Sequence, residues 1–401
     1  MPESDLPACF LSPDRFFSHL SAIEKDQESV FRLASSIEKQ FEVTNPWRQW
    51  ISESIQLKSR LQNKNFPMPF WMISGQRLEM ATHFSLARFH ASLVPEVVSE
   101  VLDMTMGAGF DTVAFLMAGL QVSGWESDES AFYQMMANRA LWKLDSLNVF
   151  HGDSTNLIPD PTVFVYADPM RRSGTKRMAG YRPDPSGLKV AEKQPVLIKL
   201  SPMEDPTIWI NRGFKTIAVS YERECREVLI HRNLNPEITA RSVWIDGVWF
   251  QSDHQPDQIP SHSEGPDSIY WPDPALLVSG LAGVTAEALN LKPIQPGTWL
   301  CLGKTTGVEP LFIQYYLLDN QYYKLSFLDR MLGGLVRERP LIFKKKYSRV
   351  DIDSFQGRYQ NRSVDYSQKP IIVLITDIGN KSVFYLCEPA DLSQNSFIKP
   401  R

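Results

Sequence analysis

The sequence predicts an α/β protein built around a doubly wound parallel sheet, with a helical segment before it and a smaller α+β domain after it. The chain has 401 residues, more than one hydrophobic core usually serves. Apolar strands and helical segments alternate through its middle part. A polar, proline-rich stretch then precedes the C-terminal residues. We expect a helical segment at 1–92, an α/β domain at 93–251, a linker at 252–268 and an α+β domain at 269–401.

The composition is that of a globular chain. Hydrophobic residues make up 43% and charged residues 22% of the sequence, which argues against disordered, fibrous and membrane classes. The net charge of -4 gives no overall attraction to phosphate, so nucleic-acid binding would need a local basic face. The cysteines form no CxxC pair and the N-terminus shows no signal peptide, so we expect a cytoplasmic protein with reduced thiols and no zinc ribbon.

The N-terminal segment is predicted to be helical. Apolar residues recur at helix-like spacing over 13–61 and are interrupted at Asn45-Pro46, which predicts two or three helices. The prolines of NKNFPMPFW then predict a turn or an extended stretch. A further helix is expected at roughly 76–92.

The central part continues as strands and helices in alternation. It reads VVSEVLDM, DTVAFLMAGL, QVSGWE, SAFYQMMANRALWKL, LNVFHGD and TVFVYADP, and PVLIKLS and KTIAVSYE extend the series as buried strands. TIWINRG between the last two predicts a short helix or loop. ITARSVWI and VWFQ, joined by Asp246-Gly247, predict an antiparallel hairpin that closes the domain.

The C-terminal part mixes both element types. PALLVSGLAGV and FLDRMLGGLVRER predict helices, and TWLCLG, FIQYYLL and PIIVLITDI predict strands. We therefore expect a small α+β domain.

The first of these strands ends in a motif with chemical meaning. It ends at Asp103, and Gly107 and Gly109 then lead into the next helix. Glycine there lets the backbone approach a nucleoside closely. The GxGxxG pattern of dinucleotide sites is not met, because Asp111 and Thr112 follow where a third glycine is expected. The spacing favours a nucleoside ligand other than a dinucleotide.

Three later strand ends carry acids. Glu126 ends the second strand, where a carboxylate can accept hydrogen bonds from two ribose hydroxyls. Asp153 follows the third strand, in a position to meet an adenine edge, and Asp168 follows the fourth, beside a reactive centre. Ligands of open α/β sheets bind at the carboxyl ends of the strands. The sequence therefore predicts one nucleoside site built from successive strand ends.

This run resembles the class I S-adenosylmethionine-dependent methyltransferases, and more closely a bacterial subgroup with a THUMP-like C-terminal domain. QRLEMATHFSLARFHAS is similar to the helix before the core in that subgroup, YADPMRR contains its Asp-Pro-x-Arg-Arg signature, and YWPDPALLVSGL resembles the start of its C-terminal domain. The resemblance covers roughly 76–401. It implies a Rossmann-like fold and S-adenosylmethionine as cofactor, and it leaves the substrate open.

The resemblance also implies roles for individual residues. The cofactor-binding set is Asp103, Thr105, Gly107, Gly109, Asp111, Thr112, Glu126, Asp153 and Ser154, and the catalytic set is Asp168, Pro169, Arg171 and Arg172. Asp103, Gly107, Gly109 and Asp111 would surround the methionine part, Glu126 the ribose and Asp153 the adenine, while Asp168 would face the methyl acceptor.

Two motifs depart from common patterns. Thr105 stands where many methyltransferases have a first glycine. Met170 and Arg171 stand where enzymes that methylate base amines often have a small residue and a stacking aromatic, which argues against amine methylation of a flipped base.

Methyl transfer requires chiefly that nucleophile and donor be positioned, with no metal or covalent nucleophile. Asp168 could orient an acceptor N–H or O–H, and Arg171 or Arg172 could bind a phosphate or carboxylate. Structural roles stay open: Asp168-Pro169 as a turn, and the arginines as solvated or paired side chains. Cys225 lacks the motif of a nucleophile and fits a structural role.

The first functional hypothesis is methylation of an rRNA or tRNA nitrogen or oxygen. Basic stretches that could bind RNA contain Arg171, Arg172, Lys176, Arg177, Lys344, Lys345 and Lys346, and Phe343 and Tyr347 could stack a base. One alternative is a methyltransferase of a small molecule or protein. Another is a cofactor-binding or RNA-binding protein without turnover.

Overall fold

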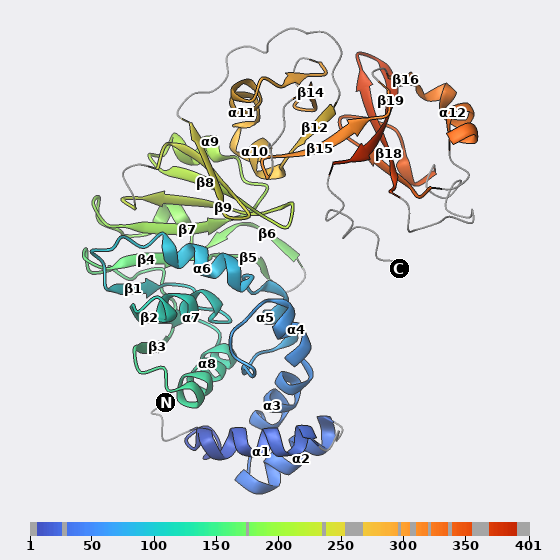
Figure 1. Cartoon of the computed structure of the whole chain (residues 1–401). Coiled ribbons are helices and arrows are strands. Elements are labelled where there is room, and N and C mark those ends of the chain that lie inside the picture. The colour runs from blue at the N-terminus through green and yellow to red at the C-terminus, as the bar shows by residue number, and fades with distance from the viewer. Residues whose placement is uncertain are drawn as a thin grey trace. The chain divides into compact units, whose positions relative to one another are not determined.

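The fold class is confirmed: the protein combines a nine-stranded, mostly parallel sheet with a second, mostly antiparallel sheet (Figure 1). A computed structural model describes residues 6–25, 30–173, 176–234, 238–252, 268–295, 298–304, 310–319, 322–335, 339–354 and 369–390. Contacts divide the chain into two compact units, 1–200 with 229–238 and 201–228 with 239–401. The domain boundaries inferred from the sequence stay a prediction, and 253–267 of the expected linker lie outside the described residues.

The first sheet carries the predicted strand ends. Its strands are β1 (Glu100–Asp103), β2 (Gln121–Glu126), β3 (Leu147–His151), β4 (Phe164–Ala167), β7 (Val196–Leu200), β8 (Lys215–Tyr221), β9 (Glu224–Arg232), β10 (Arg241–Ile245) and β11 (Val248–Ser252). Their order is β11-β10-β8-β9-β7-β4-β1-β2-β3. β1 pairs in parallel with β2 on one side and β4 on the other, so the winding reverses there. Ligand sites of open α/β sheets lie at such a switch point.

The neighbouring strands β4 and β7 are apolar because both faces of a parallel sheet are covered. All four residues of β4 are buried, and β7 is buried except at Lys199. The connecting helices α7 (Phe110–Met117) and α8 (Glu129–Trp142) follow β1 and β2 as expected. The predicted hairpin is confirmed as β10 and β11, whose turn has positive φ at Asp246 and Gly247.

One strand of this sheet was not expected. β9 occupies Glu224–Arg232, in a stretch with charged residues at both ends around the buried run Glu227–His231. The charged flanks hid the short apolar run from a prediction based on hydrophobicity.

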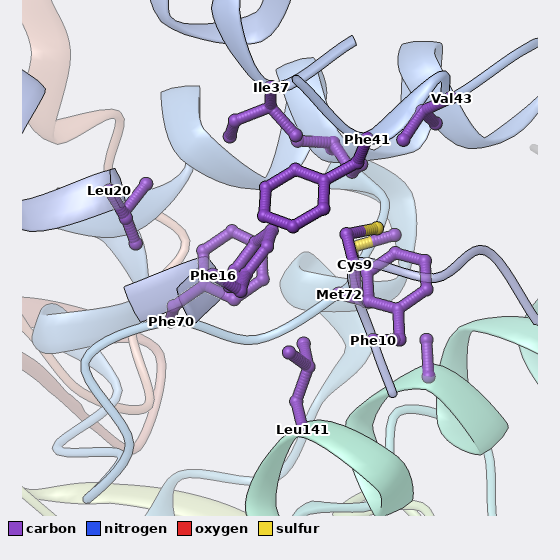
Figure 2. Packing of buried hydrophobic residues seen from close by; sticks show 12 residues of the cluster. Cys9, Phe10, Phe16, Leu20, Ile37, Phe41, Val43, Phe70, Met72 and Leu141 are labelled. Carbon is purple, nitrogen blue, oxygen red and sulfur yellow. The ribbon is translucent and has the colours of Figure 1, made fainter. Parts of the chain in front are cut away.

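The N-terminal helices belong to the first unit and share an apolar cluster with α8. They are α1 (Pro13–Lys25), α2 (Val30–Phe41), α3 (Trp47–Gln56) and α4 (Lys58–Asn63). Phe16, Phe41 and Phe70 meet Leu141 of α8 in this cluster, as Figure 2 shows. The expected two or three helices over 13–61 are four in the described residues, because Leu57 separates α3 from α4.

The expected single helix at 76–92 is wrong in one respect. Two helices occur instead, α5 (Gly75–Met80), capped by Ser74, and α6 (Phe84–Ser92), capped by His83. Ala81 and His83 are extended, so the helix cannot continue between them. The break places Thr82 between two helix ends, where its side chain is buried.

The second unit contains the other sheet. Its strands are β12 (Ser268–Pro272), β13 (Lys292–Pro293), β14 (Cys301–Gly303), β15 (Phe312–Leu317), β16 (Tyr323–Lys324), β17 (Leu341–Lys345), β18 (Ile371–Ile378) and β19 (Lys381–Pro389). Helices of this unit are α9 (Pro206–Ile210), α10 (Pro274–Ser279), α11 (Ala282–Ala288) and α12 (Leu328–Leu335), with a 3-10 turn at Leu325–Phe327. The strands follow the order β13-β14-β12-β15-β19-β18-β17, with β16 paired to β19.

A separate ribbon of β5 (Met170–Ser173) and β6 (Lys176–Arg182) follows β4, and a 3-10 turn spans Pro185–Gly187. Among the described residues, no helix is long and apolar enough to cross a membrane.

Candidate active site

The loop after β1 is held in a conformation that requires glycine. Gly107 has a φ of 54° and Gly109 a φ of 78°, both in the left-handed region. A Cβ on Gly109 would lie 2.7 Å from the Met135 Cε atom. The Trp71 indole N–H donates to the Ala108 carbonyl at 2.9 Å, which fixes the loop from the other side. The loop is thus tightly packed against α8 and against the segment before α5.

Glu126 lies at the end of β2 and is oriented by backbone groups. Its Oε2 atom accepts from the Gly107 N–H at 2.9 Å, and its Oε1 atom accepts from the Asp128 N–H at 2.8 Å. Arg77 of α5 is 3.9 Å from Oε2 and binds Asp128 at 3.0 Å. A carboxylate offers about four lone-pair sites, so these bonds leave acceptor capacity for hydroxyl groups. The predicted ribose role of Glu126 stays a prediction.

Asp103 is a buried acid at the end of β1. Its Oδ1 accepts from the Thr105 N–H at 3.1 Å and its Oδ2 from the Thr112 hydroxyl at 2.7 Å. Burial, with smaller contributions from the charges of Asp111 and Asp168, outweighs the lowering effect of these hydrogen bonds and raises the pKa of Asp103 to about 7. Asp103 therefore changes its charge near neutral pH.

Asp111, in the first turn of α7, is affected in the opposite direction. The Thr82 hydroxyl donates to its Oδ2 at 2.7 Å, and His90 Nδ1 lies 2.7 Å from its Oδ1. Burial alone would raise the pKa of Asp111, but the hydrogen bond and charge of His90 and the charge of Lys199 lower it below its usual range. The sequence prediction missed Thr82 and His90. A polar residue in a helix break and a histidine in an apolar helix were the available signals.

Asp168 follows β4 and is held at two points. Its N–H donates to the Thr105 hydroxyl at 2.6 Å, and its Oδ2 accepts from the Lys199 ammonium at 2.8 Å. Thr105, which departs from the common glycine, thus links the end of β1 to the start of the β4 loop. Lys199 also donates to the Thr82 hydroxyl at 2.9 Å. The sequence prediction missed Lys199 as well, although a charged residue in an apolar strand is a recognisable signal.

The residues after β3 lie at the same edge. Ser154 is buried and its hydroxyl donates to the Met104 carbonyl at 2.6 Å, so it connects the β3 and β1 loops. Asp153 is exposed, and its Oδ1 accepts from the N–H and hydroxyl of Thr155. These hydrogen bonds lower the pKa of Asp153. The adenine role of this loop stays a prediction.

The remaining predicted catalytic residues are described in part. Pro169 is buried directly after Asp168. Arg171 and Arg172 belong to β5, and Arg172 faces Arg177 of β6 in the ribbon, while Lys176 begins β6. The side chains of these basic residues lie outside the described residues.

The basic run of β17 alternates between the two faces of its sheet. Phe343 is buried among apolar residues that include Leu328 and Leu332 of α12. The expectation that Phe343 stacks a base is therefore wrong, because its ring is part of the core. Lys345 is exposed and donates to the Val350 carbonyl at 2.9 Å.

Lys344 and Lys346 lie on the other face, against aromatic rings. The Lys344 ammonium donates to the Tyr315 hydroxyl at 2.9 Å. The Lys346 ammonium lies 5.4 Å from the ring centre of Trp271 and 5.5 Å from that of Tyr347. Burial lowers the pKa of both lysines. Tyr347 is exposed and keeps the predicted possibility of stacking.

The cysteines form no disulfide with one another. Burial raises the pKa of the Cys225 thiol to about 12, with smaller contributions from Asp273 and Glu227. A thiol of this kind is a poor nucleophile, in keeping with a structural role. Across the described part of the chain, no group of three histidine, cysteine, aspartate or glutamate side chains could hold a metal ion.

Comparisons with known proteins bear on the fold. No protein-family model matches the chain, and a search of curated proteins found no match. A solved structure described as a "putative methyltransferase" from Porphyromonas gingivalis W83 is similar with a TM-score of 0.65 and 20% identity, over 87% of this chain and 92% of that chain. This likeness shows that the chain has a methyltransferase-like fold.

Two further structures match over smaller parts. A "putative RNA methyltransferase" from Pyrococcus horikoshii has a TM-score of 0.28 at 18% identity, over 37% of this chain and 81% of that chain. The glycopeptide N-methyltransferase MtfA, in complex with S-adenosyl-L-methionine, has a TM-score of 0.23 at 20% identity, over 31% of this chain and 51% of that chain. Both likenesses are too distant to bear on the function of this chain.

Replacing Gly109 by alanine should destabilise the protein more than replacing Gly119. Both glycines have positive φ, so both substitutions strain the backbone by about 1–2 kcal/mol, but only at Gly109 would the new Cβ meet a neighbour, Met135. Overpacking adds about 1–3 kcal/mol. Urea unfolding of Gly109→Ala and Gly119→Ala, each also in a Met135→Ala background, measures the difference. Equal costs in the unsubstituted background would contradict the packing argument.

Asp103 should make the free energy of unfolding fall as the pH rises from about 4 to about 7. In this window the Asp103 carboxyl group is protonated in the native state and ionised in the unfolded chain, so a rise in pH favours the unfolded state. Asp103→Asn removes this fall, so its stability relative to the wild type should increase across the window by up to about 1.4 kcal/mol per pH unit. Thermal unfolding across this range measures it, with exposed Asp145→Asn as control. A constant difference for Asp103→Asn would show that its raised pKa is wrong.

Proposed function

We propose that this protein is an S-adenosylmethionine-dependent methyltransferase. The observation that carries the proposal is the arrangement at the switch point, where the Gly107–Gly109 loop and Glu126 are joined by a hydrogen bond at the ends of neighbouring strands. The positive φ angles of Gly107 and Gly109 allow the loop backbone to come close to a ligand at the strand end, and Glu126 supplies an acceptor for vicinal hydroxyls. These groups fit a nucleoside with an amino-acid arm.

The residues would divide the cofactor between them. Asp103 and the glycine loop would bind the methionine part, Glu126 the ribose, and the Asp153-Ser154 turn the adenine. When bound, the cofactor supplies a methyl group on a positively charged sulfur. Asp168 would orient the acceptor by accepting a hydrogen bond from its N–H or O–H.

We further propose that the acceptor is a nitrogen or oxygen of RNA, that the C-terminal domain is THUMP-like, and that the protein acts in the cytoplasm. Lys345 is exposed on β17, and Lys346 lies beside the rings of Trp271 and Tyr347. A cation next to partly exposed aromatic rings suits a single-stranded nucleic acid, which offers both phosphates and stacking faces. The cysteines without disulfides agree with a reducing compartment.

Calorimetric titration with S-adenosylmethionine and S-adenosylhomocysteine tests the cofactor. We expect micromolar dissociation constants for the wild type, and for Glu126→Ala a loss of at least about tenfold, because charge-assisted hydrogen bonds contribute about 1.5–3 kcal/mol each. The control is Glu129→Ala, an exposed glutamate at the start of α8 that should bind as the wild type does. No binding by the wild type would refute the proposed function. Binding without any methyl transfer to cellular RNA or small molecules would favour a binding protein.

RNA binding should depend on the salt concentration and on Lys345 and Lys346. For a single-stranded RNA, the logarithm of the association constant should fall with the logarithm of salt concentration at a slope of about 0.7 per phosphate contact. Lys345→Ala and Lys346→Ala should each reduce this slope by about that amount, whereas Lys381→Ala at the start of β19 should leave it unchanged. Fluorescence anisotropy with a labelled RNA measures it. A response independent of salt would remove RNA from consideration.

A further inference from the structure

A continuous set of hydrogen bonds runs from the predicted acceptor side to the break before α6 and to α6 itself. The Lys199 ammonium donates to Asp168 Oδ2 at 2.8 Å and to the Thr82 hydroxyl at 2.9 Å. Thr82 in turn donates to Asp111 Oδ2 at 2.7 Å, and His90 Nδ1 lies 2.7 Å from Asp111 Oδ1. The resemblance assigned no role to Lys199, Thr82 or His90.

The direction of these bonds is determined by their chemistry. A lysine ammonium has donors only, and an ionised carboxylate has acceptors only. The Thr82 hydroxyl donates its single hydrogen bond to Asp111, so its oxygen accepts the hydrogen bond from Lys199. The ammonium is therefore held between two anions, Asp168 directly and Asp111 through Thr82. Lys199 is mostly buried, with 14% of its side chain exposed, so screening by water is weak at this position.

We propose that Lys199 is a positioning residue for the methyl acceptor, because its ammonium pairs with the Asp168 carboxylate and holds it in place at the carboxyl end of β4. An ionised Asp168 only accepts hydrogen bonds, so the substrates it orients are those that carry a proton on the reacting nitrogen or oxygen. Acceptors methylated on carbon, or on a nitrogen without a proton, have nothing to donate to it. The inference rests on the proposed function and narrows its substrate class.

The charged groups around Asp168 define what an experiment would detect. Lys199 contacts it from β7, Thr105 binds its N–H from the β1 loop, and Asp103 and Asp111 act on the same region through their charges. Burial raises the pKa of Asp103 to about 7, so its charge changes around neutral pH. Every variant is therefore compared with the wild type at the same pH.

The ratio of two dissociation constants reports the charge at this centre. S-adenosylmethionine carries a sulfonium charge and S-adenosylhomocysteine does not, so the ratio of their affinities rises when a nearby anion is left without its cation. In Lys199→Met we expect the preference for S-adenosylmethionine to increase at least about threefold at about pH 8. Lys199→Arg should follow the wild type, and so should Lys193→Met, an exposed lysine before β7.

Each outcome of this calorimetric experiment is decisive. If both affinities fall equally in Lys199→Met and the ratio stays at the wild-type value, Lys199 is only structural and the inference is overturned. If Lys199→Met does not fold, Asp168→Asn replaces it: the preference should fall about threefold with Lys199 left in place, and an unchanged ratio would again overturn the inference. If the wild type binds neither compound, the proposed function itself fails, and this inference fails with it.

Discussion

The candidate active site depends on the buried charge of Asp111. A carboxylate out of contact with water must be paired and hydrogen-bonded, and removing one partner of such a group typically costs about 3–5 kcal/mol. Here the partners come from separate segments: His90 from α6, Thr82 from the break before it, and Lys199 through Thr82 from β7. The segment of α5 and α6 is consequently part of this site. Its fold and that of the sheet are coupled through one carboxylate.

The same coupling is visible on the other side of the glycine loop. Asn138 of α8 accepts from the Met72 N–H at 2.7 Å and donates to the Met72 carbonyl at 3.0 Å, so the segment before α5 is bound as if by a neighbouring strand. The adjacent Trp71 reaches the Ala108 carbonyl. Behind this segment lies the apolar cluster of the first helices (Figure 2). Burial of that cluster and the polar contacts at Met72 therefore support the loop on which Gly107 and Gly109 lie.

The strand ends could be predicted from sequence because the pattern that identifies each of them lies within a short stretch of the chain. An apolar run that ends at Asp103, or at Glu126, identifies both the strand and the edge at which its acid lies. The helix break at Thr82 and the contact between Thr82 and Lys199 could not be predicted from sequence, because these two residues are 117 positions apart and meet only when the sheet forms. The basic run of β17 shows the same limit. The lysines are visible in the sequence, but the burial of Phe343 in the core becomes apparent only from the register of the sheet.

The two acids of the β1–α7 region show how one loop creates different electrostatic sites. Burial raises the pKa of Asp103 to about 7, while His90 and Lys199 outweigh burial and lower the pKa of Asp111. When the pKa values of two neighbouring acids are shifted in opposite directions in this way, the two acids have different roles. Because its pKa is lowered, Asp111 carries a negative charge that helps to position Lys199 through Thr82. Asp103 contributes little charge below neutral pH. The carboxylate that remains at the β4 end is Asp168, 35% exposed and paired with Lys199. In the proposed reaction, the loss of the sulfonium charge would then take place beside an ion pair whose net charge is zero.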